Sequence, residues 1–507
     1  MNDQAVRKIV IAGGGTAGWM AAAAISHVFK DRSVAVELVE SEAIGTVGVG
    51  EATLPPIRFF NTEIGVNEAE FLKATQASYK LGIEFRDWAH LGSNFFHGFG
   101  DFGLNIAGVS PLHYWMKLRQ MGRGFDYETL SVPTVMARAG KFAPPHPDPR
   151  SPLANFSYAY HFDALLYAGF LRSIAERNGV KRTEGRIVRT DLRGEDGFIE
   201  AVVLDSGARV AGDVFLDCSG FSGLLIEGAL QTGFEDFSRY LPVDRAWAVP
   251  CQSAGAFTPY TRSTALEAGW QWRIPLQHRT GAGYVFCSDF VSEDEAAARL
   301  LKGLDGEPLA EPRLLKFTTG RRRRFWNRNC IALGLASGFL EPLESTSISL
   351  IQGGIARFLE LFPDKRFDRR IIDEYNRIQT SEFDRIRDFI ILHYYGSRRE
   401  DTPFWRSCRQ MEIPETLAYK MRVFEACGWL VMSGEDSFQP ASWQSIYYGL
   451  GIEPERYDPT LAAQDIEAVA AELSRRRDGL AAAAALLPTH ADFIKRRLPA
   501  GPTRVLQ

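Results

Sequence analysis

Cysteine is scarce in this sequence, and the few cysteines are scattered. The 507 residues hold six of them, and no two form a CxxC pair. Dispersed thiols in a chain of this length are typical of the reducing cytoplasm, where a buried cysteine behaves as a small hydrophobic residue. We therefore predict a cytoplasmic protein with neither a disulfide framework nor a metal site. The six are Cys218, Cys251, Cys287, Cys330, Cys408 and Cys427.

A marked charge excess of either sign is also missing. The 58 basic and 62 acidic residues leave a formal net charge of -4, so the charge balance favours neither a nucleic acid nor an anionic membrane as a partner. With 45% hydrophobic and 24% charged residues, the composition is that of an ordinary globular protein. Internal repeats and low-complexity linkers are absent, so the chain is expected to be one folded unit, and its length predicts two closely packed regions within it.

Charged residues are lacking from Ile9 to Phe29, a stretch about as long as a transmembrane helix. Glycines interrupt this stretch, however, and a β-type run, Ile9 to Ile11, precedes them. A strand, a tight turn and a helix explain the segment better than a membrane span does. The segment is not a signal peptide either, because the charged start is followed directly by a folding motif without a credible cleavage site.

The turn in this segment has the pattern of a dinucleotide-binding loop. Gly13, Gly15 and Gly18 fill the three positions of GxGxxG between a predicted strand and a helix. These glycines permit the turn, let the backbone approach a pyrophosphate and let the helix pack on the strand, while the helix N-terminus presents free N–H groups. A second predicted strand, 34–39, ends in Glu40, which is suited to bind a ribose and disfavours a 2′-phosphate. The motif alone leaves FAD and NAD open.

The rest of the chain does not continue as regular βαβ units. Residues 45–56 are expected to form a glycine-rich loop with a proline stop. Short strands are predicted within 185–216, and a helical region from about residue 354 onward. The last 45 residues are rich in alanine, and we expect Arg475-Arg476-Arg477 there to belong to a solvated helix face.

Four further segments resemble the flavin-dependent halogenases of the tryptophan halogenase type. The resemblance covers roughly residues 5–460, and its most specific part is the full WxWxIP signature, Trp270, Trp272, Ile274 and Pro275. The segments are Gly48-Val49-Gly50-Glu51-Ala52-Thr53, Trp270 to Pro275, Gly334 to Ile348 with Pro342-Leu343-Glu344-Ser345-Thr346, and His393-Tyr394-Tyr395 with Asp401-Thr402-Pro403-Phe404-Trp405.

This resemblance implies FAD as the cofactor and an α/β fold. A Rossmann-like FAD-binding core with interleaved β-rich, substrate-facing segments would occupy 1–350, and the mainly helical 351–507 would complete the substrate pocket. In the family, reduced FAD and O2 give a C4a-hydroperoxide that oxidises chloride or bromide to hypohalous acid, which moves to a separate aromatic pocket. The implied FAD-binding residues are Gly13, Gly15, Thr16, Ala17, Gly18, Glu40, Val49, Glu51, Ala52, Ile187, Leu335 and Ile348.

By position in the family's motifs, Lys80 and Glu344 match the two catalytic residues. A compact ammonium can hold and polarise the oxidant, or react as a neutral amine where burial lowers its pKa. A carboxylate can assist the attack on the ring or remove its proton. Without the resemblance, Lys80 would be one of many surface lysines, and Glu344 a helix cap or an ion-pair partner.

The resemblance also implies a halide site and a barrier beside the flavin. The backbone N–H groups of Thr346 and Ser347 stand where the family binds halide, although many tryptophan-specific relatives carry glycine at Ser347. Trp270 and Trp272 share one face of a predicted strand ending at Pro275. These two tryptophans are interpreted as core aromatics, as a barrier that keeps the organic substrate away from the flavin, or as both.

For the substrate we expect a small aromatic compound, such as an indole. His97 and Phe99 match positions that sandwich an indole in the family, and Trp443 is a candidate stacking residue. The segment from Ser442 to Gly451 is shorter than the one with which tryptophan-specific enzymes hold the amino-acid backbone. Indole-like aromatics are therefore expected rather than free tryptophan.

The nearest alternative is a single-component aromatic hydroxylase that uses NAD(P)H directly. Such enzymes carry a Gly-Asp segment late in the FAD domain, but the stretch from Gly334 to Gly338 lacks the aspartate, and a second GxGxxG is missing. Both absences favour a separate NAD(P)H-dependent flavin reductase as the partner. A non-catalytic flavin-binding sensor is a third alternative, and it would have no use for Lys80, Glu344 and WxWxIP together. Neither nucleic acid nor membrane is an expected partner, and a homodimer stays open.

Overall fold

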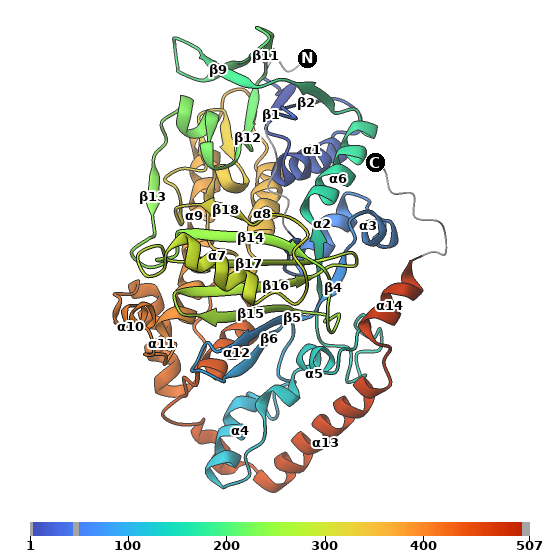
Figure 1. Ribbon diagram of the computed structural model, residues 1–507, viewed down its shortest axis with the longest axis vertical. Helices are drawn as coiled ribbons and strands as arrows, with labels where there is room; N and C mark the ends of the chain where they lie inside the picture. The colour runs from blue at the N-terminus through green and yellow to red at the C-terminus, as the bar shows by residue number, and fades with distance from the viewer. Residues whose placement is uncertain (1–3, 44–49, 499–507) are drawn as a thin grey trace.

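The computed structural model describes residues 4–43 and 50–498 (Figure 1). Its first sheet is the expected dinucleotide-binding sheet, with the order β20-β21-β12-β1-β2-β8, and only the β20–β21 pair is antiparallel. The strands are β1 (Lys8–Ala12), β2 (Ala35–Glu40), β8 (Lys181–Glu184), β12 (Val214–Asp217), β20 (Trp326–Asn327) and β21 (Cys330–Ala332). Helix α1 (Thr16–Val28) packs between this sheet and the helices α6 (Ala164–Arg177) and α8 (Ser347–Glu360).

A second, seven-stranded sheet crosses the middle of the molecule in Figure 1. Its order is β18-β14-β17-β16-β15-β5-β6, and its pairs are antiparallel except for β15–β5. The strands are β5 (Gly82–Arg86), β6 (Asn94–Gly98), β14 (Arg245–Cys251), β15 (Thr261–Leu266), β16 (Gly269–Pro275), β17 (Thr280–Phe286) and β18 (Arg313–Lys316).

Three small sheets complete the β structure. The sheet β3-β7-β4 lies against the seven-stranded sheet through contacts of β3 with β16 and β17. It contains β3 (Gly50–Ala52), β4 (Ser78–Lys80) and β7 (Ala159–Asp163). The other two contain β9 (Ile187–Leu192), β10 (Ile199–Leu204) and β11 (Arg209–Ala211), and β13 (Phe234–Asp236), β19 (Gly320–Arg322) and β22 (Gly338–Phe339).

Helices dominate the carboxy-terminal part, as predicted. The 27-residue helix α9 (Arg369–Tyr395) contacts α8, α10, α11 and α12, so it forms the centre of this region. The remaining helices are α2 (Pro56–Glu63), α3 (Glu68–Ala74), α4 (Pro111–Gln120), α5 (Val132–Arg138), α7 (Glu293–Lys302), α10 (Pro403–Gln410), α11 (Glu415–Cys427), α12 (Pro440–Leu450), α13 (Ile466–Ala485) and α14 (His490–Arg497).

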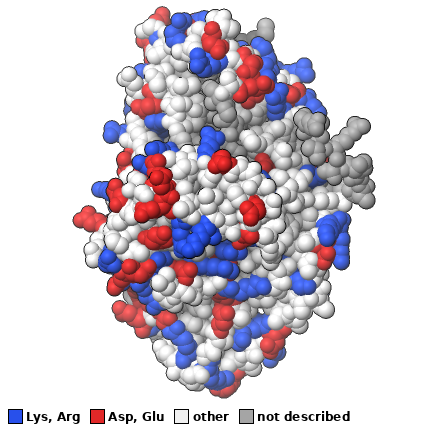
Figure 2. Space-filling view, viewed as in Figure 1, with Lys and Arg blue, Asp and Glu red and all other residues white. Residues whose placement is uncertain are grey.

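The predicted α/β class with a Rossmann-like domain is confirmed, and the uncharged stretch 9–29 is strand, turn and helix. The division at residue 350 stays a prediction: it falls within α8, and one buried hydrophobic cluster contains residues from both sides of it. Among the described residues, no helix is both long and apolar enough to cross a membrane. The six cysteines are free thiols, and Figure 2 shows both signs of charge interspersed over one face.

One local expectation was wrong, and a second holds only in part. The stretch 45–56 was expected to be a loop with a proline stop, but Gly50–Ala52 pairs with β7 as a strand, and Pro56 starts α2 because proline suits the first turn of a helix. The run of three arginines is only partly solvated. Arg476 donates to the carbonyl oxygen of Leu104, and Arg477 lies over the ring of Phe125.

Candidate active site

The loop after β1 is built from glycines whose positions leave no room for a side chain. Gly13 has a φ of +110°, and a Cβ there would overlap the carbonyl group of Cys218. A Cβ on Gly18 would overlap the carbonyl oxygen of Gly13. The amide of Gly13 donates to the carbonyl oxygen of Val39 at 2.8 Å, which ties the loop to β2. The loop thus has the close backbone path that a pyrophosphate contact requires.

Helix α1 begins directly after this loop. Its N-cap is Gly15, which offers no side-chain acceptor, and its first turn carries no acidic residue. The amides of the first turn, which includes Thr16 and Ala17, therefore have no intrahelical acceptor. Such amides suit the phosphates of a dinucleotide.

Glu40, at the end of β2, lies beside the loop. A Cβ on Gly14 would overlap its carboxylate, and Arg182 on β8 donates to Oε1 of Glu40 at 2.5 Å. A carboxylate fixed next to the glycine loop fits the predicted ribose contact. Together with the loop and the start of α1, it fits the adenosine and pyrophosphate portion of FAD.

The other predicted FAD-binding residues are spread over several elements. Burial raises the pKa of Glu51 to about 7, so this carboxyl can be neutral beside an anionic cofactor. Ile187 packs against the buried cluster that contains Val10 and Val39. Glu51 and Ala52 lie in β3, Leu335 in the turn Gly334–Ala336, Ile348 in the first turn of α8, and Val49 outside the described residues.

Lys80 ends β4 and is completely buried. Its Nζ donates to the carbonyl oxygen of Thr53 at 3.0 Å and to the hydroxyl of Ser345 at 2.9 Å, and it lies 5.2 Å from the centre of the Phe99 ring. Burial lowers the pKa of Lys80 to about 7, although the charge of Glu344 acts in the opposite direction. The amine can therefore give or take a proton near neutral pH.

Glu344 ends the short 3-10 turn Pro342–Glu344 and is also completely buried. The ring nitrogen Nδ1 of His97 lies 2.9 Å from its Oε2, and Nε2 of His393 lies 2.8 Å from its Oε1. Burial would raise the pKa of Glu344, but the two histidines bring it down to about 2. The carboxylate is thus ionised and can accept a proton.

Ser345 connects the two candidate catalytic residues. It follows Glu344 in the chain and has a φ of +61°, in the left-handed region that non-glycine residues seldom adopt. Its N–H donates to the carbonyl oxygen of Pro342 at 3.0 Å, while its hydroxyl accepts from Lys80. Lys80 and Glu344, which are far apart in the sequence, therefore lie in one buried site.

The WxWxIP strand, β16, is hydrogen-bonded near both ends to residues that lie close in the chain to the two candidate residues. At one end Trp270 Nε1 donates to Oε2 of Glu341 at 2.8 Å, three residues before Glu344. At the other end the hydroxyl of Ser78 donates to the carbonyl oxygen of Pro275 at 2.6 Å, two residues before Lys80. Trp270, Trp272 and Ile274 are buried. The predicted strand ending at Pro275 is confirmed, and its function as a barrier stays a prediction.

The predicted halide site lies where α8 begins. Thr346 is the N-cap, and Ser347 is the first helical residue. Amides at this end of a 14-residue helix have no intrahelical acceptor, and the helix dipole favours an anion there. The position, next to Glu344 and Ser345 in the chain, fits the predicted backbone binding of halide.

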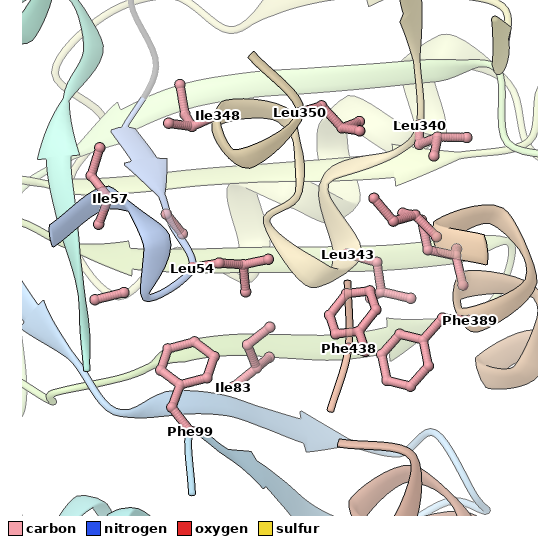
Figure 3. Packing of buried hydrophobic residues seen from close by; sticks show 14 of the residues in the cluster. Leu54, Ile57, Ile83, Phe99, Leu340, Leu343, Ile348, Leu350, Phe389 and Phe438 are labelled. Atoms are coloured by element: carbon pink, nitrogen blue, oxygen red, sulfur yellow. The ribbon is translucent and has the colours of Figure 1, made fainter. Parts of the chain in front are cut away.

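Aromatic rings lie around His97, which is bonded to Glu344. Figure 3 shows Phe99, Phe438 and Phe389 below Leu54 and Leu343. The ring of His97 makes edge or tilted contacts with the rings of Phe99, Phe389 and Phe438, with centroids 5.9 to 6.2 Å apart. Trp443 is buried and meets the Phe389 ring edge-on at 4.9 Å. The three predicted substrate residues therefore belong to one aromatic cluster, and His97 is also bonded to Glu344.

Sequence reasoning missed three residues of this site: Ser345, Glu341 and His393. Burial raises the pKa of Glu341 to about 7, and its Oε2 accepts from Tyr394 as well as from Trp270. One signal was available for His393, which sits in the apolar run from Phe389 to Tyr394. A polar side chain in a buried helix needs a partner, so this histidine indicated an unseen contact.

Comparison with known proteins gives consistent results over nearly the whole chain. Residues 8–466 match the family model described as tryptophan halogenase. The chain is 36% identical to tryptophan 6-halogenase ThaL of Streptomyces albogriseolus, over 97% of this chain and 99% of that protein.

Solved structures agree. The flavin-dependent halogenase BrvH from Brevundimonas sp. BAL3 superimposes with a TM-score of 0.95 at 47% identity, over 98% of this chain and 100% of that one. A flavin-dependent halogenase from Xanthomonas campestris superimposes with a TM-score of 0.94 at 45% identity, over the same shares of the two chains.

Proposed function

Since this chain belongs to the tryptophan halogenase family and is a flavin-dependent halogenase, we propose that it halogenates an electron-rich aromatic ring at Lys80 and Glu344. One observation carries the proposal. Lys80 and Glu344 are both completely buried, and Ser345, which adjoins Glu344, accepts a hydrogen bond from Lys80 at 2.9 Å. An amine with a pKa of about 7 next to an ionised carboxylate provides a proton donor and a proton acceptor in one buried site.

When bound, reduced FAD supplies, together with O2, the two-electron oxidation that turns chloride or bromide into hypohalous acid. The glycine loop, the start of α1 and Glu40 would hold this cofactor, and the first amides of α8 would hold the halide. The indoles of Trp270 and Trp272, which are buried, would separate the cofactor from the aromatic substrate.

In the ring halogenation, hypohalous acid and an aromatic C–H become an aromatic C–halogen and water. Lys80 Nζ donates a hydrogen bond to the oxygen of hypohalous acid, which polarises the bond to the halogen. As the halogen joins the ring carbon, the oxygen leaves as water with a proton from Lys80. Glu344 accepts the proton that the ring carbon loses, and that proton returns to Lys80.

The substrate we propose is a neutral indole-like aromatic rather than free tryptophan. The side chains around His97 are rings of Phe99, Phe389 and Phe438, which offer a flat and apolar surface. The cation over the Trp443 ring, Lys420, already pairs with Asp436 at 3.0 Å. It is therefore not free to bind the carboxylate of an amino acid.

The experiment combines the enzyme with a flavin reductase, FAD, NADH and halide, and it screens indoles, phenols and free tryptophan for product masses. We expect halogenated products from indoles, with a separate reductase required. Lys80→Ala should give none, while the control Lys302→Ala, an exposed lysine in α7, should match the wild type. Hydroxylated products that form without halide would overturn the proposal in favour of the hydroxylase alternative.

A further inference from the structure

The carboxylate of Glu344 has a histidine at each oxygen. His393 Nε2 lies 2.8 Å from Oε1, and His97 Nδ1 lies 2.9 Å from Oε2. All three side chains are at most 1% exposed. Water therefore does not compete for these hydrogen bonds, and both oxygens of the carboxylate are fixed in position.

The protonation of His393 follows from its partners. Its Nδ1 lies 2.8 Å from the carbonyl oxygen of Phe389, and a carbonyl oxygen only accepts, so Nδ1 carries a hydrogen. Its Nε2 faces Glu344. If Glu344 is ionised, Nε2 carries a hydrogen too and His393 is a cation. If Glu344 is protonated, it donates to a neutral His393.

The groups around the carboxylate favour the ionised form. The titratable groups that face Glu344 are His97 from β6, His393 from α9 and Lys80 from β4. Burial works against ionisation, yet the hydrogen bonds that the two histidines donate lower the pKa of Glu344. One buried anion then needs a buried cation beside it, since an uncompensated charge in the interior is costly. Lys80 donates to Thr53 and Ser345 rather than to this carboxylate, so the cation in hydrogen-bond contact with it is a histidine.

His97 does not need to be that cation. Its Nε2 is buried and has no hydrogen-bond partner among the described residues. A neutral ring with hydrogen on Nδ1 satisfies the bond to Glu344 and leaves a lone pair on Nε2. A cationic ring would bury an N–H without an acceptor, which is the more costly arrangement.

We propose that His393 is the positioning residue of Glu344: with a hydrogen on each ring nitrogen, it fixes the carboxylate in its ionised state and in the orientation that accepts the ring proton. This role rests on the proposed function of Glu344. The contact of Nδ1 with the carbonyl oxygen of Phe389 fixes the position of the imidazole relative to α9. The rings of Phe85 and Trp88, with centroids 5.1 and 6.0 Å away, hold its plane.

Two substitutions separate the two contacts of this ring. His393→Asn can reach the carbonyl oxygen of Phe389 but is too short to replace Nε2. His393→Gln can place an N–H near the position of Nε2 and donate to Glu344, without carrying a charge. The two variants are matched in polarity and differ in which contact they keep.

We expect His393→Asn to lower kcat for the halogenated aromatic by about 100-fold, the usual scale for loss of an oriented acid or base. KM for the aromatic and the release of hypohalous acid without aromatic substrate should stay within about threefold of the wild type. The kcat of His393→Gln should be about tenfold higher than that of His393→Asn, because an N–H again fixes Oε1 of Glu344. Equal kcat values for the two variants, or a loss confined to KM, would overturn the positioning role.

Nitrogen NMR of histidine-labelled protein tests the same claim without any turnover. The signal that disappears in His393→Gln belongs to His393. In the wild type at pH 7 it should report hydrogen on both ring nitrogens, and in Glu344→Gln it should report hydrogen on one ring nitrogen only. A neutral His393 at pH 7 in the wild type would refute the proposal, even if halogenation is observed. The doubly protonated ring would support it even if the substrate assay fails.

Discussion

Replacing Lys80 by methionine tests the electrostatics of the site in a measurable way. Lys80 is fully buried, and burial brings its pKa from the usual 10.5 to about 7. A shift of that size corresponds to about 5 kcal/mol of destabilisation of the folded protein while the lysine carries its proton. Methionine keeps the length of the side chain and removes the charge.

The pH dependence follows from proton binding. Below pH 7 the lysine is protonated in the folded and the unfolded chain, so the full cost is present. Between about pH 7 and 10.5 only the unfolded chain binds this proton, so the free energy of unfolding of the wild type rises with pH. The cost is absent above that range.

The methionine variant loses two hydrogen bonds, because the carbonyl oxygen of Thr53 and the hydroxyl of Ser345 lose their donor. At about 1 kcal/mol for each bond, Lys80→Met should be more stable than the wild type by about 3 kcal/mol at pH 6 and less stable by about 2 kcal/mol near pH 10.5.

The assay is denaturant unfolding of both proteins at pH 6, 7, 8.5 and 10. The difference between the two free energies of unfolding cancels the titrating groups that do not interact with Lys80. The exposed control Lys302→Met should differ little from the wild type at every pH. If the stability difference between Lys80→Met and the wild type did not change with pH, Lys80 would not have a lowered pKa in the folded protein. That result would also refute the idea that Lys80 exchanges protons near neutrality.

Three further changes test other parts of the site. Trp270→Phe keeps an aromatic ring and removes the N–H that donates to Glu341. We expect kcat for halogenation to fall about tenfold, while FAD binding measured by fluorescence is unchanged. An unchanged kcat would contradict a positioning effect of β16. Gly18→Ala should weaken FAD binding by at least about 100-fold because its Cβ would overlap backbone, whereas Gly169→Ala in α6, which meets nothing within 4 Å, should bind FAD normally. Ser347→Gly keeps the backbone N–H, so steady-state KM for chloride should stay within about threefold, and a tenfold rise would show that the side chain takes part.

Local signals predicted the parts of the fold that local physics decides. The glycine loop, Glu40 at the end of β2 and the β16 strand could be predicted because turn geometry and alternation leave a pattern over a few residues. Strand β3 was missed because Gly50–Ala52 is a strand only through pairing with β7, more than a hundred residues later. Residues without side-chain alternation give no sign of such a partner.

The candidate site also depends on contacts that a local sequence pattern does not predict. Lys80 and Glu344 were found through motif positions, but their burial and shifted pKa values depend on contacts between distant segments. The histidines that hold Glu344 are 247 and 49 residues away from it in the chain. His97 was predicted to stack on substrate, and the structure gives its Nδ1 a second task that composition and spacing do not indicate.

The most direct test of the central claim omits the reductase. FAD is reduced chemically without oxygen, mixed with the enzyme, bromide and indole, and exposed to O2, and the product is examined by mass spectrometry. We expect a brominated indole with the paired bromine isotope peaks, absent when Lys80→Ala replaces the wild type. An indole that gains oxygen instead, in equal amount with and without bromide, would contradict the central claim.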